Sequence, residues 1–82
     1  MVKMNNVLLV GELIEKYYNR ITIKIKGGEE TDVTVYIPDN IYDAIEDNCN
    51  LYDIIGVKGH ICRDLSGIYI KADRVSILGG TQ

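Results

Sequence analysis

The sequence predicts an all-β fold with one short helix, a five-stranded Greek-key barrel whose helix lies between strands 3 and 4. Isoleucine and valine alternate with polar residues in several short segments, a pattern typical of strands that bury one face. The one helical pattern falls after the third of these segments. Five short strands would leave an apolar face in water if the sheet stayed open. Closure into a barrel, with a helix over one end, covers that face.

Three strands are predicted before the helix, over residues 7–15, 20–26 and 31–37. The first is apolar on both faces, and Gly11 within it favours a bulge that lets a small sheet close. In the second and third, isoleucine or valine occupies every second position and polar residues lie between. A turn over residues 16–19 is expected to join the first two strands, and a glycine-rich hairpin loop the second to the third.

A short amphipathic helix is predicted directly after Pro38. Asp39 and Asn40 carry side chains suited to capping its N-terminus. Apolar residues then recur at helical spacing within residues 41–45, and carboxylates lie on the opposite side. The pattern indicates a helix of about two turns.

Two strands are predicted after the helix, over residues 54–63 and 68–78, with a kink near Asp73 in the second. The order of three strands, a helix and two strands is that of the oligonucleotide/oligosaccharide-binding (OB) barrel. We therefore expect a single OB-fold domain over residues 1–78 and a flexible C-terminal end over residues 79–82.

The composition is that of a soluble globular protein, with 46% hydrophobic and 26% charged residues. No apolar run approaches the ~18 residues of a membrane span, and the first residues lack the apolar stretch of a signal peptide. The two cysteines are too few for a disulfide-rich secreted scaffold. We expect a cytoplasmic protein that does not associate with membranes.

Charge is segregated along a chain whose formal net charge is −3. Residues 27–57 contain eight acidic residues and neither lysine nor arginine, whereas residues 1–26 and 58–82 are each net basic. If the two basic blocks meet in space, an acidic protein has a positive surface, because a docking phosphate responds to charge within a Debye length. The alternative is ordinary solvation of a small domain.

The sharpest candidate for binding is an outward row on the second predicted strand, Arg20, Lys24 and Lys26, beside Tyr36 on the third. In an OB barrel these two strands form the ligand face. Alternate positions of a strand lie about 6.7 Å apart, within reach of successive phosphates on an extended single strand. A tyrosine among the cations can stack a base, worth roughly 1–3 kcal/mol. The alternative interpretation is a solvated outer face, favoured by the acidic residues next to this row.

Further candidates lie in the first loop and around the last turn, the usual borders of an OB cleft. These nucleic-acid-binding candidates are Tyr17, Tyr18, Arg63, Tyr69 and Lys71. Of the two adjacent tyrosines, one is expected to contact a base or a partner and the other to pack on the barrel rim. Tyr42 and Tyr52 border the helix and are expected to close the barrel bottom.

The sequence contains no catalytic constellation. His60 and Cys62 share a predicted strand face and could hold zinc together with Cys49, but their spacing matches no metal-binding knuckle. No nucleophile or acid stands at a spacing from the histidine that implies a triad. We expect no enzymatic activity, no metal and no cofactor.

Three segments resemble the bacterial single-stranded DNA-binding protein family: residues 4–13, 55–61 and 67–78. The first opens on Met-Asn and an apolar run, the second is an apolar strand with Gly before a polar residue, and the third ends in Val and Leu. The resemblance implies an OB fold and a role in replication. Glu12 and His60 replace family arginines, and the chain has no Trp, no Phe and no acidic-tipped tail. In this it is similar to the small, tail-less primosomal relatives, which dimerise.

Two functions from different classes follow. The first is non-sequence-specific binding of single-stranded nucleic acid, with DNA as the first candidate; RNA stays open, because stacking and backbone contacts work on both. The second is a protein-interaction OB module that acts as an assembly subunit in a replication or mobile-element complex. The acidic block over residues 27–57 favours the second, since it would repel DNA and attract a basic partner.

Self-association into a homodimer or homotetramer is expected through the first strand. A small barrel needs only one apolar face of this strand, so the other is free to pack against a second copy. The two faces consist of Leu8, Val10 and Ile14, and of Val7, Leu9 and Leu13. The alternative is that the helix and the chain ends cover the second face.

Overall fold

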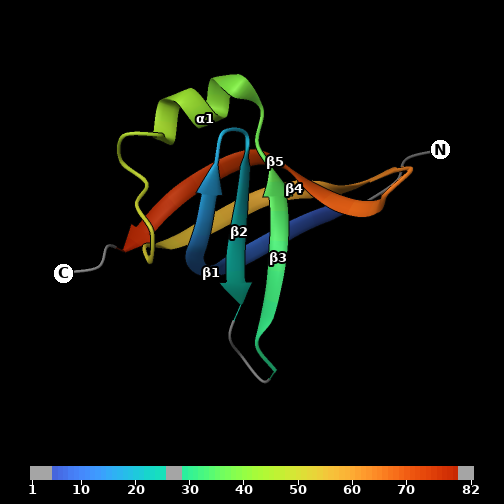
Figure 1. The fold of residues 1–82 in the computed structure, drawn as a ribbon, viewed down its shortest axis with the longest axis horizontal. Coiled ribbons are helices and arrows are strands. Elements are labelled where there is room, and N and C mark those ends of the chain that lie inside the picture. Colours follow the sequence, from blue (N-terminus) through green and yellow to red (C-terminus); the bar gives the residue numbers. More distant parts are fainter. Residues whose placement is uncertain (1–4, 26–28, 80–82) are drawn as a thin grey trace.

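The computed structural model describes residues 5–25 and 29–79, and it forms one closed five-stranded barrel with a short helix (Figure 1). Around the barrel the strands follow the order β1-β2-β3-β5-β4. The elements are β1 (Asn6–Tyr17), β2 (Arg20–Ile25), β3 (Thr31–Tyr36), α1 (Asp39–Ile45), β4 (Ile54–Asp64) and β5 (Gly67–Gly79). The predicted OB fold, with its helix between the third and fourth strands, is confirmed.

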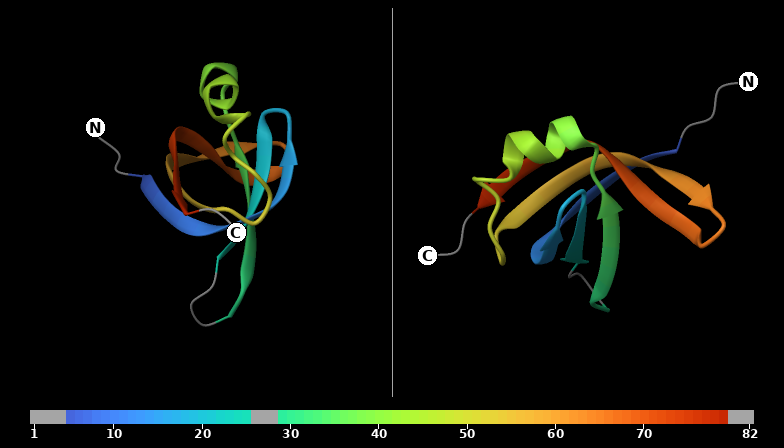
Figure 2. Two further views of the ribbon diagram at one scale, coloured as in Figure 1. Left: turned by 90° about the vertical axis from the view of Figure 1, so that its left-hand side faces the viewer. Right: turned by 45° about the horizontal axis from the view of Figure 1, so that its top comes forward.

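Two hairpins project from the barrel in different directions (Figures 1 and 2). One is formed by β2 and β3 and the other by β4 and β5, whose pairing runs from Ile54↔Gly79 to Asp64↔Gly67. The barrel closes where β3 meets β5 in a short parallel contact, Val35↔Ile70 and Tyr36↔Lys71. This contact brings the outer face of β3 beside the β4–β5 hairpin.

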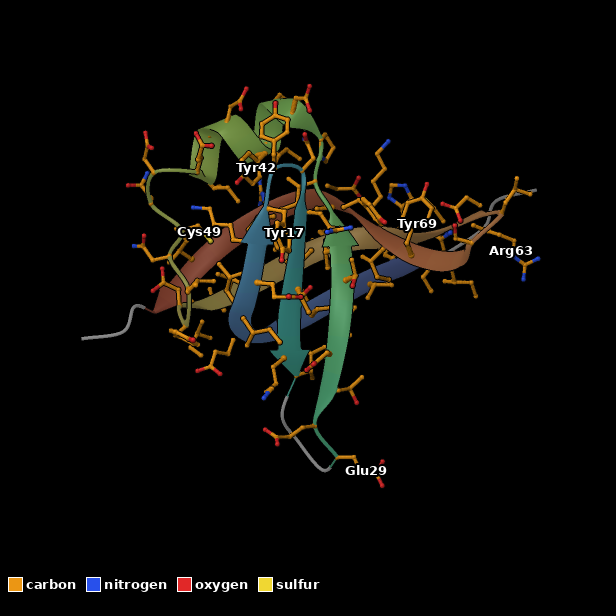
Figure 3. The ribbon with its side chains drawn as sticks, in the orientation of Figure 1. Tyr17, Glu29, Tyr42, Cys49, Arg63 and Tyr69 are labelled. Atoms are coloured by element: carbon orange, nitrogen blue, oxygen red, sulfur yellow. The ribbon has the colours of Figure 1, made fainter. Side chains whose placement is uncertain are left out.

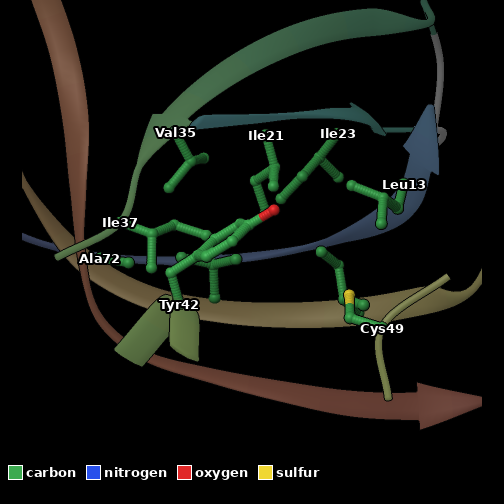
Figure 4. Packing of buried hydrophobic residues seen from close by; sticks show 10 residues of the cluster. Leu13, Ile21, Ile23, Val35, Ile37, Tyr42, Cys49 and Ala72 are labelled. Atoms are coloured by element: carbon green, nitrogen blue, oxygen red, sulfur yellow. The ribbon is translucent and has the colours of Figure 1, made fainter. Parts of the chain in front are cut away.

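The core consists of the inward row of each strand, as the alternating pattern predicts. Leu13, Ile21, Ile23 and Val35 are at most 1% exposed. Tyr42 reaches from α1 into this cluster, where it lies between the barrel walls (Figure 4), and is 4% exposed. The helix therefore closes one end of the barrel with an aromatic ring.

Close backbone approaches explain two of the glycines. A Cβ at Gly11 would lie 2.5 Å from the carbonyl oxygen of Lys24, and one at Gly59 would lie 2.3 Å from that of Lys71. Both distances are far inside van der Waals contact, so only glycine fits at either position. The strand register shifts between Leu13 and Glu15 in β1, beyond Gly11, and between Lys58 and Gly59 in β4. The irregularity predicted near Asp73 is confirmed, since Asp73 is the extra residue opposite the second shift, whereas the bulge predicted at Gly11 lies at Ile14 instead.

The predicted Asx cap of the helix is wrong. Asp39 is already the first helical residue, Pro38 precedes it, and no side chain caps the helix. The Asp39 carboxylate instead accepts a hydrogen bond of 2.6 Å from Asn19 Nδ2, which also donates to the carbonyl oxygen of Ile37 at 2.8 Å. Asn19 adopts a φ of 64°, a conformation that asparagine tolerates in tight turns. The turn between β1 and β2 thereby fixes the start of α1.

The far end of α1 is held by a lysine. Lys16 Nζ donates to the carbonyl oxygens of Glu46 and Cys49, at 2.6 and 2.7 Å. These carbonyls lie where the helix ends, and the backbone there has no further helical partner. A cation at this position also suits the negative end of the helix dipole. Lys16 therefore joins β1 to the segment that leaves the helix.

Several predicted boundaries shift. The turn predicted over residues 16–19 contains only residues 18–19, because β1 continues to Tyr17 and pairs there with Arg20. Gly79, predicted within the flexible end, is part of β5 and pairs with Ile54. Lys26, the glycines of the hairpin loop at 27–28, and residues 80–82 lie outside the described residues. Within the described part of the chain, no helix is long and apolar enough to cross a membrane.

Candidate functional site

An open groove of about 630 Å³ lies between the outer face of β2 and β3 and the β4–β5 hairpin. Its first wall is polar and aromatic, and its second is built from the end of the hairpin. The lining residues are Glu15, Tyr17, Arg20, Thr22, Asp32, Val33, Thr34, Tyr36, Asp64, Ser66, Gly67, Ile68, Tyr69 and Ile70. Strands β2 and β3 thus present their outward rows to a concave surface.

Three tyrosines and one arginine form a continuous group in this groove. The cross-strand register places Arg20 beside Tyr17 on one side and Tyr36 on the other. The Arg20 guanidinium lies 5.0 Å from the centroid of the Tyr17 ring, at cation–π distance. Tyr36 meets Tyr69 across the β3–β5 contact, with centroids 5.0 Å apart and planes at 77°. Tyr17 and Tyr36 are 53% and 41% exposed, so their rings are open to a ligand.

A smaller hollow of about 260 Å³ adjoins the groove and is lined by Tyr36, Asp64, Tyr69 and Lys71. Asp64 is held in place because its Oδ1 accepts a hydrogen bond of 2.7 Å from the backbone N–H of Ser66. Burial, the neighbouring Cys62 thiol and the Asp64 carboxylate together raise the pKa of Tyr69, so its hydroxyl stays neutral at physiological pH. The hollow therefore combines two aromatic rings with one carboxylate and one ammonium group.

The charge of the groove is mixed. Glu15, Asp32 and Asp64 line it together with a single cation among the described residues, Arg20. The Glu15 carboxylate accepts a hydrogen bond of 3.1 Å from the Thr22 hydroxyl. Lys71 adds a second cation at the adjoining hollow. Such a surface admits few phosphates.

Five of the predicted site residues come together here: Tyr17, Arg20, Tyr36, Tyr69 and Lys71. Figure 3 shows Tyr17 and Tyr69 on neighbouring parts of the molecule, and Arg63 farther out near the end of the β4–β5 hairpin. Arg63, Lys24 and Tyr18 are not among the described residues that line the groove or the hollow.

Lys24 faces outward on β2 in the same row as Arg20, but the register places it between two acidic residues, Glu12 on β1 and Asp32 on β3. Lys24 is also half-buried. The outward row therefore changes from aromatic and basic near Arg20 to charge-balanced near Lys24. Lys26, the third member of the predicted row, lies outside the described residues.

The adjacent tyrosines Tyr17 and Tyr18 point to different parts of the molecule. Tyr17 lines the groove, whereas Tyr18 packs edge-on against Tyr42 of the helix, with ring centroids 5.0 Å apart. Burial and the hydrogen-bonded Asp39 carboxylate raise the pKa of Tyr18, and burial raises that of Tyr42. The predicted role of Tyr52 is wrong: it has a φ of 74° and is 56% exposed, so it does not plug the barrel as Tyr42 does.

Sequence reasoning weighed Asp32 against binding but missed the other two acidic residues of the groove, Glu15 and Asp64. No ion pair joins Asp64 to Arg63: among the described residues the one ion pair is His60 Nδ1 with Asp73 Oδ2, at 3.1 Å. The signal for Asp64 lay in its position before a two-residue turn, where an aspartate commonly accepts a backbone N–H. Among the described residues, no group of three or more His, Cys, Asp or Glu is arranged to hold a metal ion.

Solved structures of single-stranded DNA-binding proteins share this fold. The mitochondrial single-stranded DNA-binding protein of S. cerevisiae matches with a TM-score of 0.84 and 8% identity, over 98% of this chain and 99% of that one. The dimeric N-terminal domain of PriB from Thermoanaerobacter tencongensis matches with a TM-score of 0.74 and 12% identity, over 93% of this chain and 98% of that one. The SSB domain of a Synechococcus protein matches with a TM-score of 0.72 and 16% identity, over 92% of this chain and 97% of that one. No protein-family model and no curated protein sequence matches the chain.

Proposed function

We propose that the groove binds single-stranded nucleic acid, with single-stranded DNA as the first ligand, mainly by stacking and backbone contacts. The observation that carries the proposal is that Arg20 and three tyrosine rings line one open groove. Exposed aromatic rings on a sheet, with a cation between them, are the parts from which OB barrels build stacking platforms. The neighbours in fold, which are single-stranded DNA-binding proteins by name, support the same ligand class.

In this proposal the tyrosines and the arginine contact different parts of the nucleic acid. Tyr17 and Tyr36 offer ring faces to bases, and each stacked base contributes roughly 1–3 kcal/mol. Arg20 lies between the two rings and is placed to contact the phosphate that joins the bases. Stacking does not depend on base identity, because every base has a π-face. The same contacts act on RNA.

Fluorescence anisotropy with labelled oligothymidine and oligouridine tests the proposal at low salt. Replacing Tyr36 by isoleucine keeps a strand-forming side chain and removes the ring, so the affinity should fall at least about fivefold. Tyr52→Asn is the matched control, since Tyr52 is exposed elsewhere and asparagine tolerates its positive φ. Failure of both oligomers to bind, or equal losses in the variant and the control, would overturn the proposal.

A second candidate, a protein-interaction module, is favoured by the distribution of acidic residues. Exposed carboxylates on and after α1 face solvent, at Asp39, Asp43, Glu46 and Asp47. Such a surface attracts a basic partner and repels nucleic acid. If the oligomers fail to bind and the protein co-purifies with one basic protein in a fixed ratio, this function replaces the first.

Self-association is proposed through the outer face of β1, β4 and β5. Leu8, Val10 and Leu78 are 76%, 50% and 58% exposed there. The register places Val10 beside Gly56, and a Cβ at Gly56 would lie 3.3 Å from the Leu78 side chain, so the three strands form one surface. Apolar side chains gathered over a glycine present a smooth patch that a second copy can cover, most simply as a two-fold dimer.

Sedimentation velocity tests the self-association. The wild-type chain should sediment above its monomer mass of 9.2 kDa, and Leu8→Lys should sediment as a monomer. Leu65→Lys is the matched control, because Leu65 is also an exposed leucine, at the end of the β4–β5 hairpin and away from this patch. A wild-type monomer at high concentration contradicts the dimer.

A further inference from the structure

The hollow next to the groove carries more chemistry than stacking requires. Tyr36 and Tyr69 stand at 77° to each other, so a base that stacks on one ring meets the edge of the other. Asp64 and Lys71 complete the lining. A planar ligand held there is therefore approached by an acceptor and a donor.

The two charged groups do not neutralise each other. On β5, Tyr69 lies between Gly67, which pairs with Asp64, and Lys71. Asp64 and Lys71 therefore flank Tyr69 along one outward row of the hairpin, and both side chains line the same hollow. In the described part of the chain, the one ion pair is His60–Asp73, which leaves the Asp64 and Lys71 charges to a ligand.

We infer that this hollow is a guanine-selective base pocket within the single-strand groove, an inference that rests on the proposed function. The edge of guanine that faces a partner in a duplex carries two adjacent donors, N1–H and the 2-amino group, and next to them the acceptor O6. A carboxylate accepts two adjacent donors with both its oxygens, in a bidentate pair strengthened by charge. An ammonium group suits the O6 acceptor.

Each other base matches this arrangement less well. Adenine and cytosine have a single amino group on that edge and so give the Asp64 carboxylate only one hydrogen bond. Thymine and uracil have one N–H flanked by two carbonyl oxygens, which the carboxylate repels. The order of preference is guanine, then adenine and cytosine, then thymine and uracil.

Asp64 is placed to act as a fixed reader. Its Oδ1 already accepts the Ser66 N–H at 2.7 Å, which orients the carboxylate plane and leaves Oδ2 and one lone pair of Oδ1 for the base. A reader that is orientated before binding loses little side-chain entropy when the ligand arrives. The contact is local, so it selects one nucleotide and leaves the rest of the strand unread.

Competition anisotropy with oligothymidine carrying one central deoxyguanosine tests the inference. The guanine oligomer should bind at least about fivefold more tightly than oligothymidine, the lower end for one bidentate contact. An oligomer with inosine, which has O6 and N1–H but no 2-amino group, should fall between them. Oligothymidine itself measures the proposed function, so the two ideas are separated in one experiment.

Asp64→Asn removes the paired acceptors but keeps an oxygen for the Ser66 N–H, so the turn is preserved. This variant should lose the preference for guanine: the ratio of its affinities for the guanine oligomer and for oligothymidine should fall from at least about five to about one. Asp47→Asn, an equal change of charge at an exposed position beyond α1, should keep the preference. Asp32→Asn, in the groove but outside the hollow, should keep it too.

Each outcome bears on the inference. If oligothymidine binds and guanine gives no advantage, the inference is wrong and the proposed function stands. If Asp32→Asn and not Asp64→Asn abolishes the preference, the assigned reader is wrong. If no oligomer binds, both the inference and the proposed function fail.

Discussion

The number of cations at the groove sets how steeply binding depends on salt. Arg20 lines the groove and Lys71 the adjoining hollow, so a bound oligothymidine strand, which offers Lys71 no guanine O6, brings its phosphates to two cations of the described residues. Each phosphate contact on a single strand contributes a slope of about −0.7 to a plot of log affinity against log salt. Two contacts give a slope of about −1.4, and raising salt from about 50 to 200 mM should weaken binding about sevenfold.

Arg20→Gln isolates one of the two contacts. The slope should halve to about −0.7, so the same rise in salt should weaken binding only about 2.5-fold. Arg74→Gln is the matched control. Arg74 is exposed on β5, lies opposite Lys58 in the strand register, and does not line the groove. Its slope should equal that of the wild type. Anisotropy titrations with oligothymidine at four salt concentrations measure each slope.

The slope also distinguishes a surface with two phosphate contacts from one with five. If Arg20, Lys24, Lys26, Arg63 and Lys71 all touched phosphate, as the sequence alone predicted, the slope would be about −3.5 and the loss about 130-fold. A measured slope near that value would refute the reasoning that the acidic neighbours of Lys24 and the position of Arg63 exclude them. A slope near zero would show that neither Arg20 nor Lys71 contacts phosphate.

Three further predictions concern stability, and urea unfolding followed by circular dichroism measures each. Gly59→Ala places a Cβ 2.3 Å from a carbonyl oxygen of β5 and should destabilise by about 3 kcal/mol, whereas Gly79→Ala meets nothing within 4 Å and should change stability by less than about 0.5 kcal/mol. Lys16→Met removes two charge-assisted hydrogen bonds beyond α1 and should destabilise by about 1–2 kcal/mol; the same change at the exposed Lys58 should have little effect. Burial raises the pKa of the Cys49 thiol above 9.0, so folding favours the protonated form, and its contribution is complete below pH 9 and is lost as pH rises through the folded value. The unfolding midpoint should fall between pH 8 and pH 10, and by less in Cys49→Ala; equal losses in both proteins would contradict this origin.

The strands around the groove could be predicted because their signal is local. In β2 and β3 the buried Ile21, Ile23 and Val35 alternate with polar residues, so their pairing was visible in the pattern and with it the neighbours Arg20 and Tyr36. A one-residue slip would have put the isoleucines in water. The outward rows of β2 and β3 that line the groove could therefore be predicted from the sequence.

The rest of the site depends on contacts between distant segments. Tyr18 leaves the groove because the turn after Tyr17 is only two residues long and directs it to Tyr42 on the helix. Asp64 joins the site because the β4–β5 hairpin brings it beside Tyr36, 28 positions earlier in the chain. Neither the packing partner nor the direction of a hairpin is encoded in periodicity.

The two-residue contact between β3 and β5 is the narrowest join in an otherwise extensively paired barrel. Tyr36 belongs to β3 and Tyr69 to β5, so a ligand that stacks on both rings would link the two strands across this contact. Separation of β3 from β5 and release of the ligand are then coupled. Amide hydrogens of Val35 and Ile70 should exchange with solvent more slowly once the groove is filled.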